Sequence, residues 1–268
     1  MSRQLFMEHL SWPQIKEYVN KSELILIPIG ATEEHGRHLP VSMDTIIALE
    51  LCERVSEKVG CLVGPAIPIG HSEWFMEFPG TMTFSYDLLL HLLEEYCDNL
   101  IHHGFKKLVF VSPHGLNATA IGVIGRKLRK RGILVSMINP WKILNDIAED
   151  FSGLFENKVK HAGEIMTSVA LAICPELVDM DSAEGEYVSS DMSPRINPLN
   201  SVGVCNFEGY NVDIFWRASE VTTSGAMGNP EHADGETGEQ LMSNLSAYVV
   251  EYIKEIGKID TSKSPKPE

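Results

Sequence analysis

A cluster of potential metal ligands follows a short apolar run near the start of the chain. Residues 24–29 (LILIPI) are almost all branched aliphatic residues, which is typical of a buried strand. Glu33, His35 and Asp44 come next. Glu33 and His35 are two positions apart and face the same side if the chain is extended. Asp44 can return to that point if residues 36–43 fold back. Such oxygen and nitrogen ligands suit a divalent cation such as Zn, Mn or Fe.

A fourth potential ligand, His114, follows a second apolar run at residues 107–111. Taken alone, the first segment fits a surface glutamate, a half-buried histidine and a capping aspartate equally well. Adjacent parallel strands, however, bring their carboxyl ends together, so His114 can meet the first group. The four side chains could hold one ion, or two if Asp44 bridges them. Such an ion would make hydroxide at neutral pH and polarise a carbonyl.

Two further residues could move a proton beside the ion. His161 and Glu164 lie one helical turn apart and can share a face, which suits a general acid or base. The alternative is a helix cap with a favourable first-turn carboxylate.

Four residues are candidates for contact with substrate. Trp74 and Trp141 could line a pocket, although large aromatic residues are more often found in a core or an interface. His38 could bind substrate, bind the metal or support a ligand, and a hydrogen-bonded turn histidine is an equal alternative. Glu236 opens the last predicted helix, where the helix dipole alone favours an acidic residue.

Alternating strands and helices must position these side chains. Strands are expected at 24–29, 61–69, 107–111 and 133–138, and helices at 13–20, 45–59, 86–103, 118–130, 161–172 and 236–256. This alternation predicts an α/β fold with a mostly parallel sheet and helices on both faces. We expect a single domain over residues 1–260 and a polar tail at 261–268. Residues 181–211 are polar and rich in Gly, Pro, Asn and Ser, and are expected to form a long surface excursion.

Composition limits the possible partners. The chain has 268 residues and a formal net charge of -15, which argues against nucleic acid and anionic membranes as partners. The five cysteines are scattered without a CxxC motif, which indicates reduced, buried thiols. No signal-peptide core or membrane span is visible. We therefore expect a cytoplasmic protein.

The motifs, taken in order, resemble the creatininase family of metal-dependent amidohydrolases. The family pattern G-x-x-E-x-H-G-x-H-L-P, with an Asp a few residues on, is matched by Gly30, Glu33, His35, Gly36, His38, Leu39, Pro40 and Asp44. Later matches are the FPGT at 78–81, His114 with Asn117, the HAG at 161–163 and the GNP at 228–230. The resemblance covers residues 24 to about 240.

The resemblance implies a two-metal site in an α/β fold. Glu33, His35, Asp44 and His114 would be the ligands, with Asp44 bridging, and the protein would be a homo-oligomer, often a hexamer. The chain departs from the family at Met166 and Leu116, where members carry acidic residues. A thioether does not replace a carboxylate as a ligand of a hard metal. The subunit could therefore hold one ion or two, and Glu164 could supply the carboxylate that Met166 lacks.

Three functions follow as hypotheses. The first is hydrolysis of a small cyclic carbonyl substrate, a cyclic amide or formamide C–N bond, by metal-bound hydroxide, with His161 or Glu164 moving the proton. The second keeps the site but opens a cyclic polyhydroxy ketone of the inosose type by C–C cleavage, as in inositol and sugar catabolism. The third is a non-catalytic, metal-containing α/β binding module.

Overall fold

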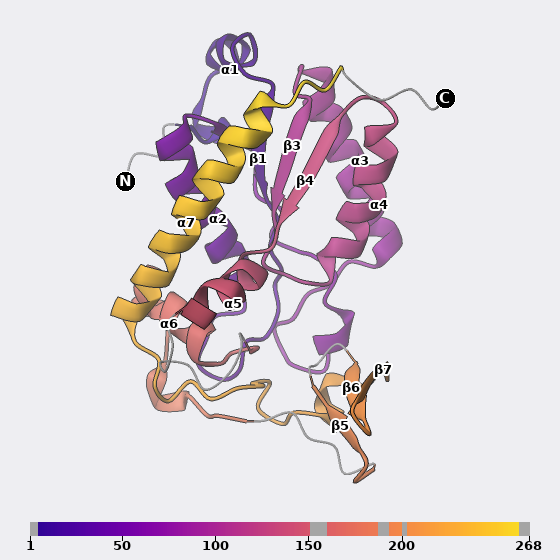
Figure 1. The fold of residues 1–268 in the computed structure, drawn as a ribbon, viewed down its shortest axis with the longest axis vertical. Helices are drawn as coiled ribbons and strands as arrows, with labels where there is room; N and C mark the ends of the chain where they lie inside the picture. Colours follow the sequence, from indigo (N-terminus) through magenta and orange to yellow (C-terminus); the bar gives the residue numbers. More distant parts are fainter. Residues whose placement is uncertain (1–4, 151–159, 187–192, 200–202, 263–268) are drawn as a thin grey trace.

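A four-stranded parallel sheet forms the centre of the molecule (Figure 1). The computed structural model describes residues 5–150, 160–186, 193–199 and 203–262. The strands are ordered β2-β1-β3-β4, and their bounds are β1 (Leu24–Pro28), β2 (Leu62–Val63), β3 (Lys107–Val111) and β4 (Leu134–Ile138). All three pairings are parallel, with Leu26 of β1 opposite Val109 of β3. The carboxyl ends of the central strands β1 and β3 therefore lie side by side.

Helices cover both faces of this sheet (Figure 1). One face packs against α2 (Met43–Val59), α6 (Glu164–Ile173) and α7 (Gly235–Lys258), and the other against α3 (Tyr86–His102) and α4 (Asn117–Arg129). Successive side chains of a strand point to opposite faces. Leu24 and Leu26 accordingly join the first core, whereas Ile25 and Ile27 join the second. Burial on both faces explains why β1 is apolar at every position.

The remaining elements lie outside this sandwich. They include α1 (Trp12–Val19) and the short 3₁₀ segments η1 (Met7–His9), η2 (Glu73–Phe75), η3 (Pro175–Leu177), η4 (Met180–Ser182) and η5 (Ala218–Glu220). Helix α5 (Pro140–Asp150) packs against α7 and adds Trp141 and Leu144 to the first core. A second, antiparallel sheet of β5 (Ile196–Pro198), β6 (Val204–Phe207) and β7 (Tyr210–Asp213) projects at one end of the molecule (Figure 1).

The predicted α/β architecture is confirmed, with three local corrections. The strand predicted at 61–69 is only Leu62–Val63, because Pro65 and Pro68 cannot donate to a ladder. Helix α5 was not predicted. The excursion predicted at 181–211 contains most of the small antiparallel sheet, which ends at Asp213 and whose hairpin turns at Glu208 and Gly209. Both have positive φ, as a type I′ turn requires, but Glu-Gly is a weaker sequence signal for it than Asn-Gly.

Two other predictions concern the whole chain. The five cysteines are free and buried, as predicted. Within the described residues, no helix is both long enough and apolar enough to cross a membrane. Residues 263–268 of the predicted tail lie outside the part of the chain that the structure describes.

Candidate metal centre

The predicted ligands meet at the carboxyl ends of β1 and β3. The segment after β1 carries Glu33 and His35, the first turn of α2 carries Asp44, and the segment after β3 carries His114. All four side chains are buried, with exposed fractions between 1% and 5%. The neighbouring positions of the two strands thus bring together residues that are 81 positions apart in the sequence (33 to 114).

Glu33, Asp44 and His114 form one three-ligand group, with a ligand atom of each lying within 4.8 Å of the others. Nδ1 of His114 is 3.3 Å from Oδ2 of Asp44 and 3.5 Å from Oε2 of Glu33. Nε2 of His114 lies 2.6 Å from the backbone oxygen of His71 and donates to it. This bond leaves Nδ1 facing the two carboxylates, the arrangement typical of a metal-binding histidine.

Glu33, His35 and His161 form a second group that shares Glu33 with the first. Nδ1 of His35 lies 2.9 Å from the backbone oxygen of Glu33 and donates to it, so Nε2 is free to act as a ligand. That Nε2 lies 3.8 Å from Oδ1 of Asp44. Nδ1 of His161 lies 4.0 Å from Oε1 of Glu33.

The ring of His161 is held on three sides. It stacks between His35 and Phe75, with ring centroids 4.6 Å and 4.9 Å away. Its Nε2 lies 2.9 Å from the backbone oxygen of Glu34 and 3.1 Å from Oε1 of the same residue. Nε2 therefore carries a hydrogen, and Nδ1 is the ring nitrogen that faces the carboxylates.

The two carboxylates favour positive charge at their centre. Burial alone would lower the pKa of His114, but the charges of Glu33 and Asp44 outweigh it and raise the pKa to about 9. Burial alone would also lower the pKa of His161. The charges of Glu34, Glu33 and Asp44 outweigh this effect and raise the pKa to about 9. Burial would raise the pKa of Asp44, but hydrogen bonding and charge from His114 and His35 lower it far below its usual range. Protons on the imidazoles balance the carboxylates as a cation would.

The donor set fits a divalent cation. Among the described residues, Oε2 of Glu33 is a buried oxygen with no hydrogen-bond partner. Such an atom is costly to bury unless something pairs with it. Two carboxylates and one to three imidazoles are ligands that Zn, Mn and Fe accept. A cation among these side chains would pair the Glu33 oxygen.

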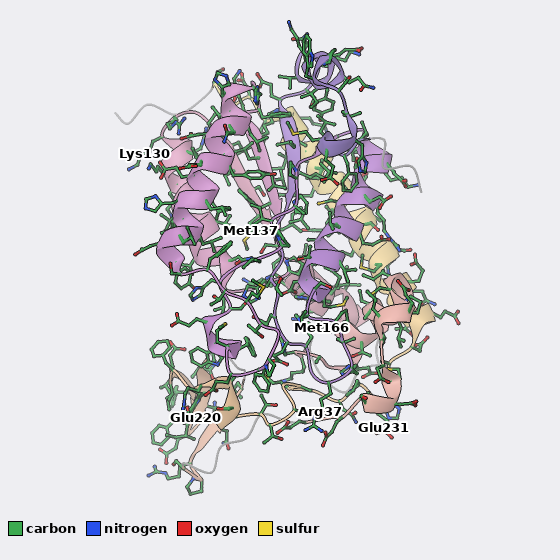
Figure 2. All side chains as sticks on the ribbon, turned by 180° about the vertical axis from the view of Figure 1, so that it is seen from behind. Arg37, Lys130, Met137, Met166, Glu220 and Glu231 are labelled. Atoms are coloured by element: carbon green, nitrogen blue, oxygen red, sulfur yellow. The ribbon has the colours of Figure 1, made fainter. Side chains whose placement is uncertain are left out.

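A cavity of about 350 Å³ opens onto these ligands. Its wall combines apolar groups with two ammonium groups: Phe75, Pro113, Leu116, Trp141, Met166, Lys142 and Lys160. Figure 2 shows Met166 beyond the lower end of the sheet, far from Lys130 at the upper end. The cavity is large enough for a small molecule.

Comparison with known families agrees with this geometry. The family model for creatininase (creatinine amidohydrolase) matches residues 8–253. This match covers both strands that carry the ligands, together with α6 and most of α7.

The chain belongs to the creatininase family.

Its relatives within this family differ in their described activities. A creatinine amidohydrolase of Pseudomonas putida is 30% identical over 201 residues, which cover 68% of this chain and 76% of that protein. A mycofactocin precursor peptide peptidase of Mycobacterium ulcerans is 34% identical over 230 residues, which cover 82% of this chain and 80% of that protein. A 3-dehydro-scyllo-inosose hydrolase of Thermotoga maritima is 27% identical over 185 residues, covering 67% and 59%. This creatininase-family chain is therefore a hydrolase whose substrate the family alone does not define.

Solved creatininase structures share the fold. A manganese form and a mutant of the Zn–Zn type each have a TM-score of 0.77 at 24% identity, covering 95% of this chain and 99% of the other. The four-stranded parallel sheet with its small antiparallel sheet is thus the creatininase fold.

Four other predicted site residues of this creatininase-family chain do not line the cavity in its described part. Glu164 lies in the first turn of α6. Trp74 packs beside the clusters around Phe75 and Trp216. Glu236 is exposed, and its backbone N–H donates to the capping Asp234 at 2.9 Å. Their functional roles remain predictions, as does that of His38.

His38 is buried behind the site. Its Nε2 lies 2.8 Å from Oγ1 of Thr167 in α6, and its backbone oxygen accepts from the N–H of Asp179 at 2.9 Å. Burial, and then the proximity of His35, lower the pKa of His38 to about 4. The ring is therefore neutral at pH 7 and ties the first motif to α6.

Sequence reasoning overlooked several residues that the structure places at the site. Glu34 was given no role, although it adjoins two ligands in the sequence and holds Nε2 of His161. Lys142 was not recognised because helix α5 was not predicted. Lys160 was not recognised because it lies outside the HAG motif, directly before His161. A signal for Glu34 existed, since it lies between Glu33 and His35.

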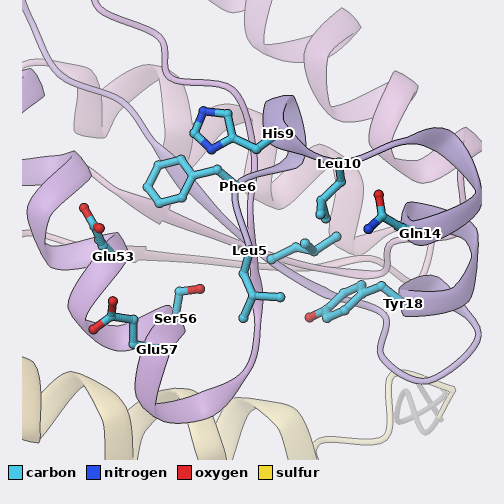
Figure 3. Close-up of a pocket in the computed structure, with 10 residues that line it drawn as sticks. Leu5, Phe6, His9, Leu10, Gln14, Tyr18, Glu53, Ser56 and Glu57 are labelled. Carbon is cyan, nitrogen blue, oxygen red and sulfur yellow. The ribbon is translucent and has the colours of Figure 1, made fainter. Parts of the chain in front are cut away.

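A larger cavity, of about 680 Å³, is lined by residues 5–18 of the amino-terminal segment, by the second half of α2 and by Leu62 of β2 (Figure 3). Its hydroxyl groups already have protein partners: Ser56 donates to the backbone oxygen of Cys61, and Tyr18 to that of Leu24. Neither three-ligand group found in the described residues lies there. The site at the carboxyl ends of β1 and β3 is therefore the better candidate for catalysis.

Proposed function

We propose that this chain is a metal-dependent hydrolase of a small cyclic carbonyl compound, most specifically of a cyclic amide or formamide C–N bond. The observation that carries this proposal is the convergence of Glu33, Asp44 and His114 into one buried group, from the segments after β1 and β3 and the first turn of α2. When bound, a divalent cation would polarise a carbonyl and lower the pKa of water. The creatinine amidohydrolase among the relatives supports the C–N bond as the target.

The chain's own residues would divide the work. Glu33, Asp44 and His114 would hold one ion, and His35 with the shared Glu33 would contact a second if it is present. His161 would take and return a proton through Nδ1, because Glu34 fixes its Nε2 and Phe75 fixes the plane of its ring. Glu164 remains an alternative for this role. Leu116, Trp141 and Met166 would exclude water around the substrate.

Metal content and turnover test the proposal together. The protein is loaded with Zn or Mn, its metal is measured by elemental analysis, and hydrolysis is assayed on creatinine, other lactams and simple formamides. Glu33→Gln and His114→Ala should lose bound metal and turnover. Full activity in both variants would refute the metal-dependent mechanism. Retained metal with no turnover on any carbonyl compound would instead indicate a binding module.

A second candidate function is C–C cleavage of a cyclic polyhydroxy ketone. It is motivated by Leu116 and Met166, two positions on the cavity wall where the chain departs from the family's acidic residues, and by the inosose hydrolase among the relatives. Assaying inosose-type cyclic diketones beside lactams separates the two reactions, since activity on lactams alone excludes this candidate.

We also propose a cytoplasmic homo-oligomer, with a hexamer as the expected state. Phe215 and Tyr210, beside and within the small sheet, are 80% and 79% exposed. Large exposed apolar side chains are typical of surfaces that another subunit covers. Light scattering coupled to size exclusion measures the assembly, and a monomer at micromolar concentration would contradict it.

A further inference from the structure

Two lysines reach the metal cavity from separate segments. Lys142 lies in the first turn of α5, and Lys160 immediately precedes His161. Within the described residues neither ammonium group takes part in an ion pair, whereas Lys127 and Lys254 pair with Glu94 and Glu251. The two cations are therefore available to a molecule that enters the cavity.

The stem of Lys160 is held by close packing against two glycines. A Cβ placed on Gly228 would lie 2.7 Å from Cβ of Lys160, and one placed on Gly163 would lie 3.0 Å from it. Any larger residue at position 228 would push the lysine away. The backbone oxygen of Lys160 also accepts from the N–H of Gly163 at 3.1 Å. Packing and this hydrogen bond therefore fix the backbone and Cβ of Lys160.

The start of α5 fixes Lys142 and adds a neutral donor. Its backbone N–H donates to Oδ1 of Asn139 at 3.2 Å, which leaves the amide NH₂ of Asn139 on the same cavity wall. The helix begins at Pro140, which has no N–H. Two ammonium groups and an amide NH₂ on one wall are donors that a carboxylate accepts from.

The charge distribution around the cavity indicates what the two lysines could bind. The chain has a net charge of -15, and the floor of the cavity carries the carboxylates of Glu33 and Asp44. Because a bound cation or the imidazole protons balance the charge of this floor, the two lysines on the wall are the positive groups that attract an anionic substituent. A substrate with such a substituent would be oriented with its carbonyl toward the ligands and its charge toward α5.

Building on the proposed hydrolase function, we propose that the substrate carries a carboxylate, which Lys142 and Lys160 bind at the wall of the metal cavity. The two lysines are specificity-determining residues, and the substrate class is a carboxylic acid whose reacting carbonyl is a separate group of the same molecule. Binding through two partly exposed ammonium groups favours the acid over its uncharged amide by about tenfold.

Matched pairs of acids and amides test this assignment. The probes are pyroglutamate and pyroglutamamide, N-formylglycine and N-formylglycinamide, and Ala-Ala and Ala-Ala-amide. Affinity for the Zn-loaded protein is measured by calorimetry, and kcat/KM is measured wherever a probe is turned over. We expect the acid of at least one pair to bind about tenfold more tightly than its amide. The preference should fall severalfold in Lys142→Met or Lys160→Met and vanish in the double variant.

Controls separate this inference from the proposed function. Lys130→Met, an exposed lysine at the far end of the sheet, should keep the preference (Figure 2). Lys160→Glu should reverse it, and circular dichroism verifies that each variant is folded. Equal binding of acid and amide in every pair, or no binding of any acid, would overturn the inference. A preference that survives in the double variant would also overturn it, because the metal would then hold the carboxylate. Metal retention in Glu33→Gln tests the hydrolase function independently.

Discussion

Nδ1 of His114 lies 3.3 Å from Oδ2 of Asp44, although His114 follows β3 and Asp44 lies in the first turn of α2, 70 positions earlier (44 to 114). The hydrogen bond from Nε2 of His114 to the backbone oxygen of His71 fixes this orientation. The imidazole is thus aimed at the carboxylate before any cation arrives, so little reorganisation is needed when one binds.

Replacing Asp44 with asparagine should weaken metal binding by about 100-fold or more, since a charged ligand is lost while the shape of the side chain is kept. Competition with a chromogenic chelator measures this affinity. Glu164→Gln is the matched control, because Glu164 does not line the cavity in the described structure. Unchanged affinity in Asp44→Asn would exclude the aspartate as a ligand.

His161→Gln should lower kcat by about 10²- to 10⁴-fold, the range typical of a lost general acid or base. If the imidazole only moves protons, bound metal stays at the native level. The distance of 4.0 Å between His161 Nδ1 and Glu33 Oε1 also permits His161 to be a metal ligand. Measuring metal content together with kcat therefore distinguishes proton transfer from metal ligation. A native kcat would assign the proton transfer elsewhere, with Glu164 as the next residue to replace.

The metal-free protein should lose stability as the pH rises from about 6.5 to 9. In the folded state the pKa values of His114 and His161 are raised to about 9 from the ordinary 6.5. Their stabilising effect is therefore complete below pH 6.5 and is lost as the pH rises through 9. Thermal unfolding in chelator should show a midpoint that falls by several degrees across this window. The unfolding midpoint of the Zn-loaded protein should change less over the same pH range. If the metal-free His114→Asn/His161→Asn double variant shows the same fall in midpoint as the metal-free native protein, this explanation is contradicted.

Gly225→Ala should lower the free energy of unfolding by about 2 kcal/mol or more. Gly225 has a φ of +85°, and a Cβ there would lie 1.9 Å from Oε2 of Glu34. Gly257→Ala in α7 is the control, because no atom lies within 4 Å of its Cβ position, and it should stabilise the helix by about 0.5 to 1 kcal/mol. Urea denaturation measures both, and equal stability of the two variants would show that residue 225 tolerates a side chain.

The sequence predicted the sheet well because strands β1 and β3 are buried on both faces and must be apolar at nearly every position. It also predicted that His114 and the first motif would meet, since parallel neighbouring strands leave few alternatives. The residues involved, Glu33, His35, Asp44 and His114, are all of types that carry ligand chemistry.

The wall of the cavity was not predictable in the same way. Lys142 and Lys160 have no periodic pattern around them, and their positions depend on tertiary packing against Gly163 and Gly228 and on the start of α5. Trp74 shows the opposite error, in which a residue type suited to a pocket packs beside other aromatic residues. Side-chain type indicates chemistry, whereas direction is decided by contacts that are distant in the sequence.

The contact between Glu34 and Gly225 has a consequence for how this protein is made. The carboxylate that holds His161 rests against a residue 191 positions later in the chain (34 to 225), and the His161 backbone oxygen accepts from the N–H of Met227. A nascent chain on the ribosome can form β1 and β3 early, but it must release the loop before α7 before the imidazole is secured. Placement of the proposed proton carrier is thereby tied to completion of nearly the whole polypeptide, whereas Glu33, Asp44 and His114 have all been synthesised by residue 114.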